Sequence, residues 1–156
     1  MYTRDFLTDL CNRLPDSHAM LKEALLSATN NTIANPSLSL KKSNIALSII
    51  VRDLYEKEMH KQVANISIRT LLLNKLFIER IYPRRIYLLM DLVRKITSNP
   101  SNDATASKSA KIVIDYLTDI VEWYTNRLQK GEKLASSVYD DGIEPPAAPQ
   151  TLSDFD

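Results

Sequence analysis

The chain contains only two glycines, Gly131 and Gly142, among its 156 residues. Residues 1–130 therefore hold no glycine-rich phosphate loop, because Walker and dinucleotide-binding loops need glycine where the backbone takes positive φ or approaches phosphate closely. The favoured two-residue hairpin turns also depend on glycine. These absences exclude the common nucleotide-binding loops from most of the chain and favour an all-helical fold.

Cysteine, histidine and long apolar runs are also scarce. The single cysteine, Cys11, has no partner for an intrachain disulfide, and no apolar run reaches signal-peptide or membrane-spanning length. The two histidines, His18 and His60, lack companion ligands at metal-binding spacing, so we expect no metal and no other cofactor. We predict a soluble cytoplasmic protein without membrane contact, in which Cys11 is a buried thiol.

Charge divides the chain into two parts. All twenty Lys and Arg residues lie at or before Lys133, together with fourteen acidic residues, which gives residues 1–133 a net charge of +6. Residues 134–156 carry five acidic residues, no cation and the prolines Pro145, Pro146 and Pro149, a composition typical of disordered segments. We therefore predict one helical domain over residues 1–133 and a flexible acidic tail over residues 134–156.

Apolar residues spaced by three and four positions predict an all-α fold, a single bundle of five to six helices. The expected helices are 3–13, a second from about Asp16 that stops before Asn30, 39–63 with Ser39 as cap, 67–81, 83–97, and a sixth with Ser107 as cap.

The same spacing assigns inward positions. It places Met20 of the second helix and Ile45 and Ile49 of the third helix in the core. The expected inward residues of the sixth helix are Ala110, Val113, Ile114, Leu117, Ile120, Val121, Tyr124 and Leu128.

The run from Ile78 to Tyr124 has a recognisable order of motifs. An apolar helix is followed by Tyr-Pro, a helix that ends in the sequence LVRKI, a small polar loop with Asn, and a Ser-led helix that ends in Trp-Tyr. With the downstream Glu-Pro-Pro at 144–146, this order resembles the HEPN superfamily of small helical domains. It is most similar to the uncharacterised branch found alone or fused to type I restriction subunits and other prokaryotic defence proteins. The resemblance covers roughly residues 78–149.

Active HEPN ribonucleases pair an Arg with a His a few residues later, and they usually assemble this site across a dimer. The resemblance implies Arg94 for the arginine and Asn99 for a loop polar residue, while Asn102 or Asp103 stands where the histidine would fall. Asn and Asp cannot replace an imidazole near pH 7. The leading hypothesis is therefore a non-catalytic HEPN-like interaction module that forms a homodimer or docks on a larger protein in a defence, restriction or toxin–antitoxin context.

Two alternatives stay open. One is a divergent metal-independent ribonuclease that uses Arg94, Asn99 and Asp103. The other is an accessory protein that binds RNA or DNA, favoured by the net charge of residues 1–133, because cations that neutralise phosphates release counterions. The candidate nucleic-acid-binding residues are Arg80, Arg84, Arg85, Arg94 and Lys95. A solvated helix face is the simpler interpretation of that strip.

Overall fold

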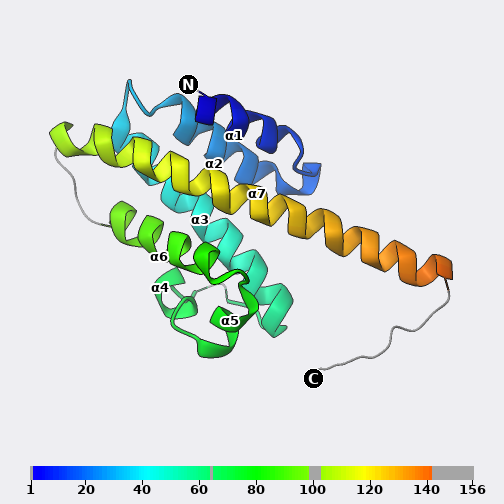
Figure 1. The fold of residues 1–156 in the computed structure, drawn as a ribbon. Coiled ribbons are helices and arrows are strands. Elements are labelled where there is room, and N and C mark those ends of the chain that lie inside the picture. Colours follow the sequence, from blue (N-terminus) through cyan, green and yellow to red (C-terminus); the bar gives the residue numbers. More distant parts are fainter. Residues whose placement is uncertain (1, 64, 99–102, 142–156) are drawn as a thin grey trace. The chain divides into compact units, whose positions relative to one another are not determined.

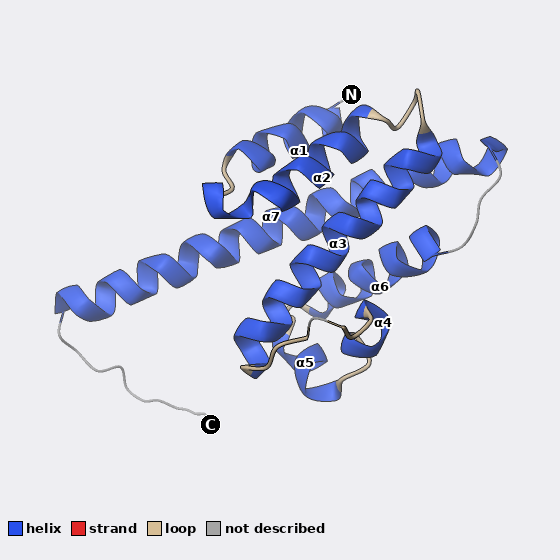
Figure 2. Cartoon of the chain, turned by 180° about the vertical axis from the view of Figure 1, so that it is seen from behind, coloured by secondary structure: helices blue, strands red, loops and turns tan. Residues whose placement is uncertain are grey.

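A computed structural model of the chain describes residues 2–63, 65–98 and 103–141 (Figures 1 and 2). These residues form seven α-helices and one short 3-10 helix, with no strand among them, which confirms the all-α prediction. In chain order the elements are α1 (Tyr2–Asn12), the 3-10 helix η1 (Asp16–His18), α2 (Ala19–Asn30), α3 (Pro36–Met59), α4 (Ile68–Leu71), α5 (Lys75–Arg80), α6 (Arg84–Ser98) and α7 (Asp103–Asp141).

The chain divides into two compact units, Met1–Tyr124 and Thr125–Asp156. Helix α7 runs through the boundary, so its first part belongs to the first unit and its remainder to the second. The helix continues past Lys133, the predicted end of the helical domain. Residues 142–156 of the predicted tail lie outside the described residues.

Helix α3 is the central element of the first unit. It packs against α2, α4, α5 and α6, and Figure 2 shows it passing between α2 and α6. Buried residues that recur every three or four positions give it a broad inward face, as expected for a helix covered on several sides. They are Ser39, Leu40, Ser43, Ala46, Leu47, Ile50, Val51, Leu54 and Tyr55.

The start of α3 lies before the predicted cap. The Asn35 side chain accepts a hydrogen bond from the backbone N–H of Leu38 at 3.2 Å, and Pro36 occupies the first helical turn. Ser39 is instead fully buried inside the helix, where its Oγ donates to the carbonyl of Ala28 in α2 at 2.7 Å. The prediction of Ser39 as a helix cap was therefore wrong, because this hydroxyl joins two helices.

The single helix expected over 67–81 is two short helices. Asn74 leaves the helical conformation and caps α5, where its Oδ1 accepts from the backbone N–H of Phe77 at 3.1 Å. Its Nδ2 donates to the hydroxyl of Tyr55 on α3 at 3.0 Å. The ring of Phe77 packs edge-to-face on Tyr55 with 4.8 Å between ring centroids. These contacts with α3 break the apolar pattern into α4 and α5.

The inward residues predicted for the sixth helix from Ala110 to Tyr124 are all buried in α7, which confirms that periodicity. The helix itself begins at Asp103, so the predicted cap at Ser107 was wrong. Met20 and Ile45 are exposed and Ile49 is half-buried, contrary to their predicted place in the core. Met20 and Ile49 line a surface cavity formed by η1, α2 and α3, which leaves Met20 exposed and Ile49 only partly covered.

Two serines one turn apart on α3 allow a matched test of the α2–α3 contact. Both are fully buried, but Ser43 Oγ has no hydrogen-bond partner among the described residues. We expect Ser39→Ala to lower the free energy of unfolding by about 1 kcal/mol, because it removes a buried hydrogen bond. Ser43→Ala removes an unsatisfied hydroxyl, so it should leave stability unchanged or raise it. Urea unfolding of both variants measures the difference, and equal losses would contradict the contact.

Candidate functional site

The arginine singled out by its sequence lies in the last turns of α6 and is held by an acid on the same helix. Arg94 Nε and Nη2 donate to Asp91 Oδ1 at 3.2 and 2.9 Å. Lys95 Nζ lies 3.0 Å from the second carboxylate oxygen, Oδ2. Only 16% of the Arg94 side chain is exposed. The guanidinium is therefore bound to Asp91 and offers little surface to a phosphate.

The Asp91 carboxylate stays charged in this setting. Burial raises its pKa, but hydrogen bonds from Lys95 and Arg94 and the charges of both cations outweigh burial, so the pKa of Asp91 lies below its ordinary value. The carboxylate consequently remains an acceptor for both cations at neutral pH. Asp91, Arg94 and Lys95 thus form an ion-pair cluster that links neighbouring turns near the end of α6.

The end of α6 is also tied to α3. Thr97 Oγ1 donates to the carbonyl of Val93 at 2.7 Å and accepts from Asn44 Nδ2 on α3 at 2.8 Å. Of the other candidate catalytic residues, Asn99 lies outside the described residues, and only the backbone of Asp103 is described, as the first residue of α7. Among the three candidates, the structure thus describes the side chain of Arg94 alone.

Neither histidine lies near the Arg94 end of α6. Asn44, which contacts Thr97, precedes Asp53 by nine residues, or about 13 Å along α3. Asp53 accepts from the hydroxyl of Tyr124, whose ring meets the edge of His18 with 6.0 Å between ring centroids. His60 ends α3 still farther along the helix. The imidazole that a HEPN ribonuclease requires is therefore not supplied by either residue from within the same copy.

Four of the five candidate nucleic-acid-binding residues face a carboxylate. The ion pairs are Arg80–Glu58, Arg85–Asp119, Arg94–Asp91 and Lys95–Asp91, with N···O separations from 2.9 to 3.6 Å. Arg84 has no carboxylate partner among the described residues, and its guanidinium lies 5.8 Å from the ring centroid of Tyr87. Acidic neighbours thus dilute the positive potential that a phosphate-binding strip needs.

Two contacts set the register between α6 and α7. Arg85 Nη1 bonds to Asp119 Oδ2 at 3.1 Å, and the indole N–H of Trp123 donates to the carbonyl of Tyr82 at 2.8 Å. From Tyr82, two residues before α6, to Arg85 in its first turn the chain advances by three residues, while their partners on α7 go back from Trp123 to Asp119. The two helices therefore run antiparallel, as Figure 1 shows for the segments on either side of residues 99–102.

This register gathers apolar side chains on one exposed face. Leu88 and Leu92 lie three and seven residues after Arg85, and Tyr116 and Ile112 lie three and seven residues before Asp119, so all four share the side marked by that ion pair. Leu88 is 48% exposed, and Leu92 and Ile112 are each 42% exposed. We call these four residues the α6–α7 face.

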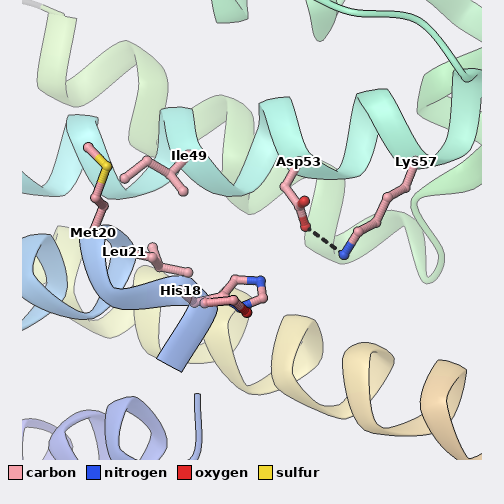
Figure 3. A pocket seen from close by; sticks show the side chains of 7 residues that line it. His18, Met20, Leu21, Ile49, Asp53 and Lys57 are labelled. Carbon is pink, nitrogen blue, oxygen red and sulfur yellow. Dashed lines mark hydrogen bonds and ion pairs between the residues drawn. The ribbon is translucent and has the colours of Figure 1, made fainter. Parts of the chain in front are cut away.

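A cavity of about 370 Å³ lies elsewhere in the first unit, formed by η1, α2 and α3 (Figure 3). Its lining residues are Ser17, His18, Met20, Leu21, Ile49, Asp53 and Lys57. Figure 3 shows the aliphatic and thioether side chains at one end and the Asp53–Lys57 pair at the other. Sequence reasoning missed this site, because its residues come from positions up to 40 apart.

The polar end of the cavity is held in place from the core. The Tyr124 hydroxyl donates to Asp53 Oδ2, and Lys57 Nζ lies 3.1 Å from the same oxygen. Burial first, and then the hydrogen bond and charge of Asp53, raise the pKa of Tyr124, so the phenol keeps its proton and remains a donor. Ser17 Oγ and His18 Nδ1 lie 3.1 Å apart beside this pair.

The remaining reactive side chain, Cys11, is fully buried, as predicted. Burial raises the pKa of its thiol to about 11, against an opposing effect of the Lys22 charge. The described residues contain no group of three or more His, Cys, Asp and Glu side chains suited to holding a metal ion. None of the described helices is both long and apolar enough to cross a bilayer.

Comparison with known proteins gave no match to any protein-family model, curated protein or solved structure. The resemblance to HEPN domains therefore stays a prediction from the order of motifs. The case for a function rests on the geometry of the first unit.

The Asp91 cluster generates a pH-dependent stability prediction. The pKa of Asp91 is lower in the folded than in the unfolded chain, so its contribution is present above the unfolded pKa and is lost as pH falls through the folded pKa. We expect Asp91→Asn to destabilise the protein most near neutral pH, because it leaves a largely buried guanidinium without its carboxylate. The difference from the unmodified protein should shrink as pH falls below about 4.

Urea unfolding over a pH series measures this difference. Asp119→Asn is the matched control, because it breaks the exposed ion pair with Arg85 and exposed pairs contribute little. A loss in Asp91→Asn that is independent of pH, or one no greater than that in Asp119→Asn, would contradict the proposed role of Asp91.

Proposed function

We propose that this chain is a non-catalytic helical interaction module that pairs with a second copy of itself through the α6–α7 face. The observation that carries the proposal is the exposure of Leu88, Leu92 and Ile112 on one side of two antiparallel helices. Clustered exposed apolar side chains mark protein contact sites more often than isolated ones do. Burial of this surface would contribute roughly 25 cal/mol for each Å² removed from water.

The charges around the face favour a second copy as the partner. Arg85 and Asp119 neutralise each other beside Leu88, and Lys95 is paired with Asp91 beyond Leu92. Because these cations are paired with carboxylates, the α6 side of the face can meet its own copy without strong like-charge repulsion. In a two-fold contact between antiparallel α6 helices, Leu88 of one copy would lie against Leu92 of the other.

The geometry of Arg94 supports a module without ribonuclease activity. Its guanidinium is bound to Asp91, and neither histidine of the same copy reaches it. We propose a cytoplasmic location for the protein, and the buried free thiol of Cys11 supports this proposal. The proposed prokaryotic defence, restriction or toxin–antitoxin context rests on the HEPN resemblance alone. In that context, the dimer would be the unit that docks on a larger protein.

Self-association through the α6–α7 face predicts a dimer that one substitution disrupts. Light scattering coupled to size-exclusion chromatography should give twice the chain mass for the unmodified protein. Leu92→Glu places a carboxylate in the apolar contact, so its mass should fall to that of one chain at the same concentration.

Ile33→Glu is the matched control for this substitution. Ile33 is also a large exposed aliphatic residue, but it lies in the connection between α2 and α3 and belongs to neither α6 nor α7. We expect the Ile33→Glu variant to remain a dimer. A monomeric unmodified protein, or equal effects of the two substitutions, would contradict the proposed surface.

The ribonuclease and nucleic-acid-binding alternatives predict a different outcome on RNA. We expect labelled single-stranded and structured RNA to stay intact and unshifted in gels at low salt, with or without chelator, because Asp91 holds Arg94. Cleavage by the unmodified protein that is lost in Arg94→Ala would overturn the non-catalytic assignment. Arg94→Lys, which keeps a cation beside Asp91, separates loss of the guanidinium from loss of the fold.

A further inference from the structure

The cavity formed by η1, α2 and α3 presents two opposite charges at fixed positions. Asp53 is partly buried, and its Oδ2 is bound by the Tyr124 hydroxyl and by Lys57 Nζ. Its second oxygen, Oδ1, accepts no hydrogen bond from the described residues. The exposed ammonium of Lys57 has further N–H groups to donate. The polar end therefore offers one free acceptor and one cationic donor side by side.

The other end of the cavity is apolar. Met20 is exposed, Ile49 is half-buried and Leu21 is buried, and Figure 3 shows these side chains facing the space beyond the charged pair. An aliphatic group placed there would cover the exposed Met20 and the exposed part of Ile49. The cavity volume of about 370 Å³ falls within the range of about 300–1,000 Å³ for small-molecule sites.

The arrangement of charge selects among ligand classes. A simple anion attracted by Lys57 would also face the Asp53 carboxylate, and a simple cation attracted by Asp53 would face the Lys57 ammonium. A molecule that carries both charges on neighbouring atoms matches both groups, because each charge meets its opposite. An α-amino acid has this arrangement, with the ammonium group and the carboxylate on one carbon.

We propose that this cavity binds a free aliphatic α-amino acid. The ligand's ammonium donates to Asp53 Oδ1, its carboxylate accepts from Lys57 Nζ, and its side chain packs on Met20 and Ile49. The buried Tyr124 acts as a positioning residue, because its hydroxyl holds Asp53 Oδ2 although Tyr124 does not line the cavity. This site shares no residue with the α6–α7 face, so each proposal can fail without the other.

Titration of the ¹⁵N-labelled full chain with L-leucine, followed by NMR, tests the ligand class. We expect saturable shifts confined to backbone amides of residues 17–21 and 49–57. Two analogues each lack one charge of leucine: 4-methylpentanoate lacks the ammonium and 3-methylbutylamine lacks the carboxylate. Each analogue should bind at least about tenfold more weakly than leucine, since each loses a charge-assisted hydrogen bond. Glycine, which keeps both charges but lacks the aliphatic group, should also bind more weakly.

Substitutions on α3 test the site itself. Lys57→Gln removes the cationic donor at an exposed position, so the fold should persist while leucine binding weakens by about tenfold. Lys41→Gln, at another exposed position of α3 outside the cavity, should bind leucine as the unmodified protein does. The absence of saturable shifts with leucine at millimolar concentration would overturn the proposal. Equal binding of leucine and either analogue, or unchanged binding in Lys57→Gln, would also overturn it.

Discussion

The packing of α3 is the constraint on which the rest of the first unit depends. This helix contacts α2, α4, α5 and α6, and its Asp53 accepts the hydroxyl of Tyr124 from α7. Ser39 joins it to α2, and Asn44 joins it to the end of α6. Because a helix rises about 1.5 Å per residue, α3 also fixes the spacing between the features attached to it. The Arg94 cluster and the cavity are thereby held apart.

Ion pairing decides what three of the four basic residues of α6, namely Arg85, Arg94 and Lys95, can do. A guanidinium that serves catalysis or phosphate binding must present its donors to a ligand, whereas Arg94 directs two donors to Asp91. Lys95 shares the same carboxylate. Leu88 and Leu92 of α6, by contrast, are 48% and 42% exposed and keep apolar surface for contact. The chemistry of α6 thus favours apolar contact with another molecule over phosphate chemistry.

The sequence predicted helix type and the inward side of α7 well, because both depend on local spacing and the buried positions from Ala110 to Tyr124 recur every three or four residues. It failed where a side chain has a distant partner. The sequence around Ser39 predicts a helix cap, but its hydroxyl bonds to the carbonyl of Ala28. Asn74 divides a helix partly because its side chain bonds to the hydroxyl of Tyr55. The sequence did not predict the cavity for the same reason, since no local pattern brings His18 beside Asp53 and Tyr124.

The central claim is that two copies meet through the α6–α7 face, and isotope-filtered NMR on a mixture of labelled and unlabelled chains tests it most directly. The account predicts nuclear Overhauser effects between copies from the methyl groups of Leu88 and Leu92. Contacts between copies that involve only other surfaces, such as the exposed Leu73 and Leu76 near α5, would contradict it. A complete absence of signals between copies, at a protein concentration at which the chain is folded and a dimer is expected, would also contradict it.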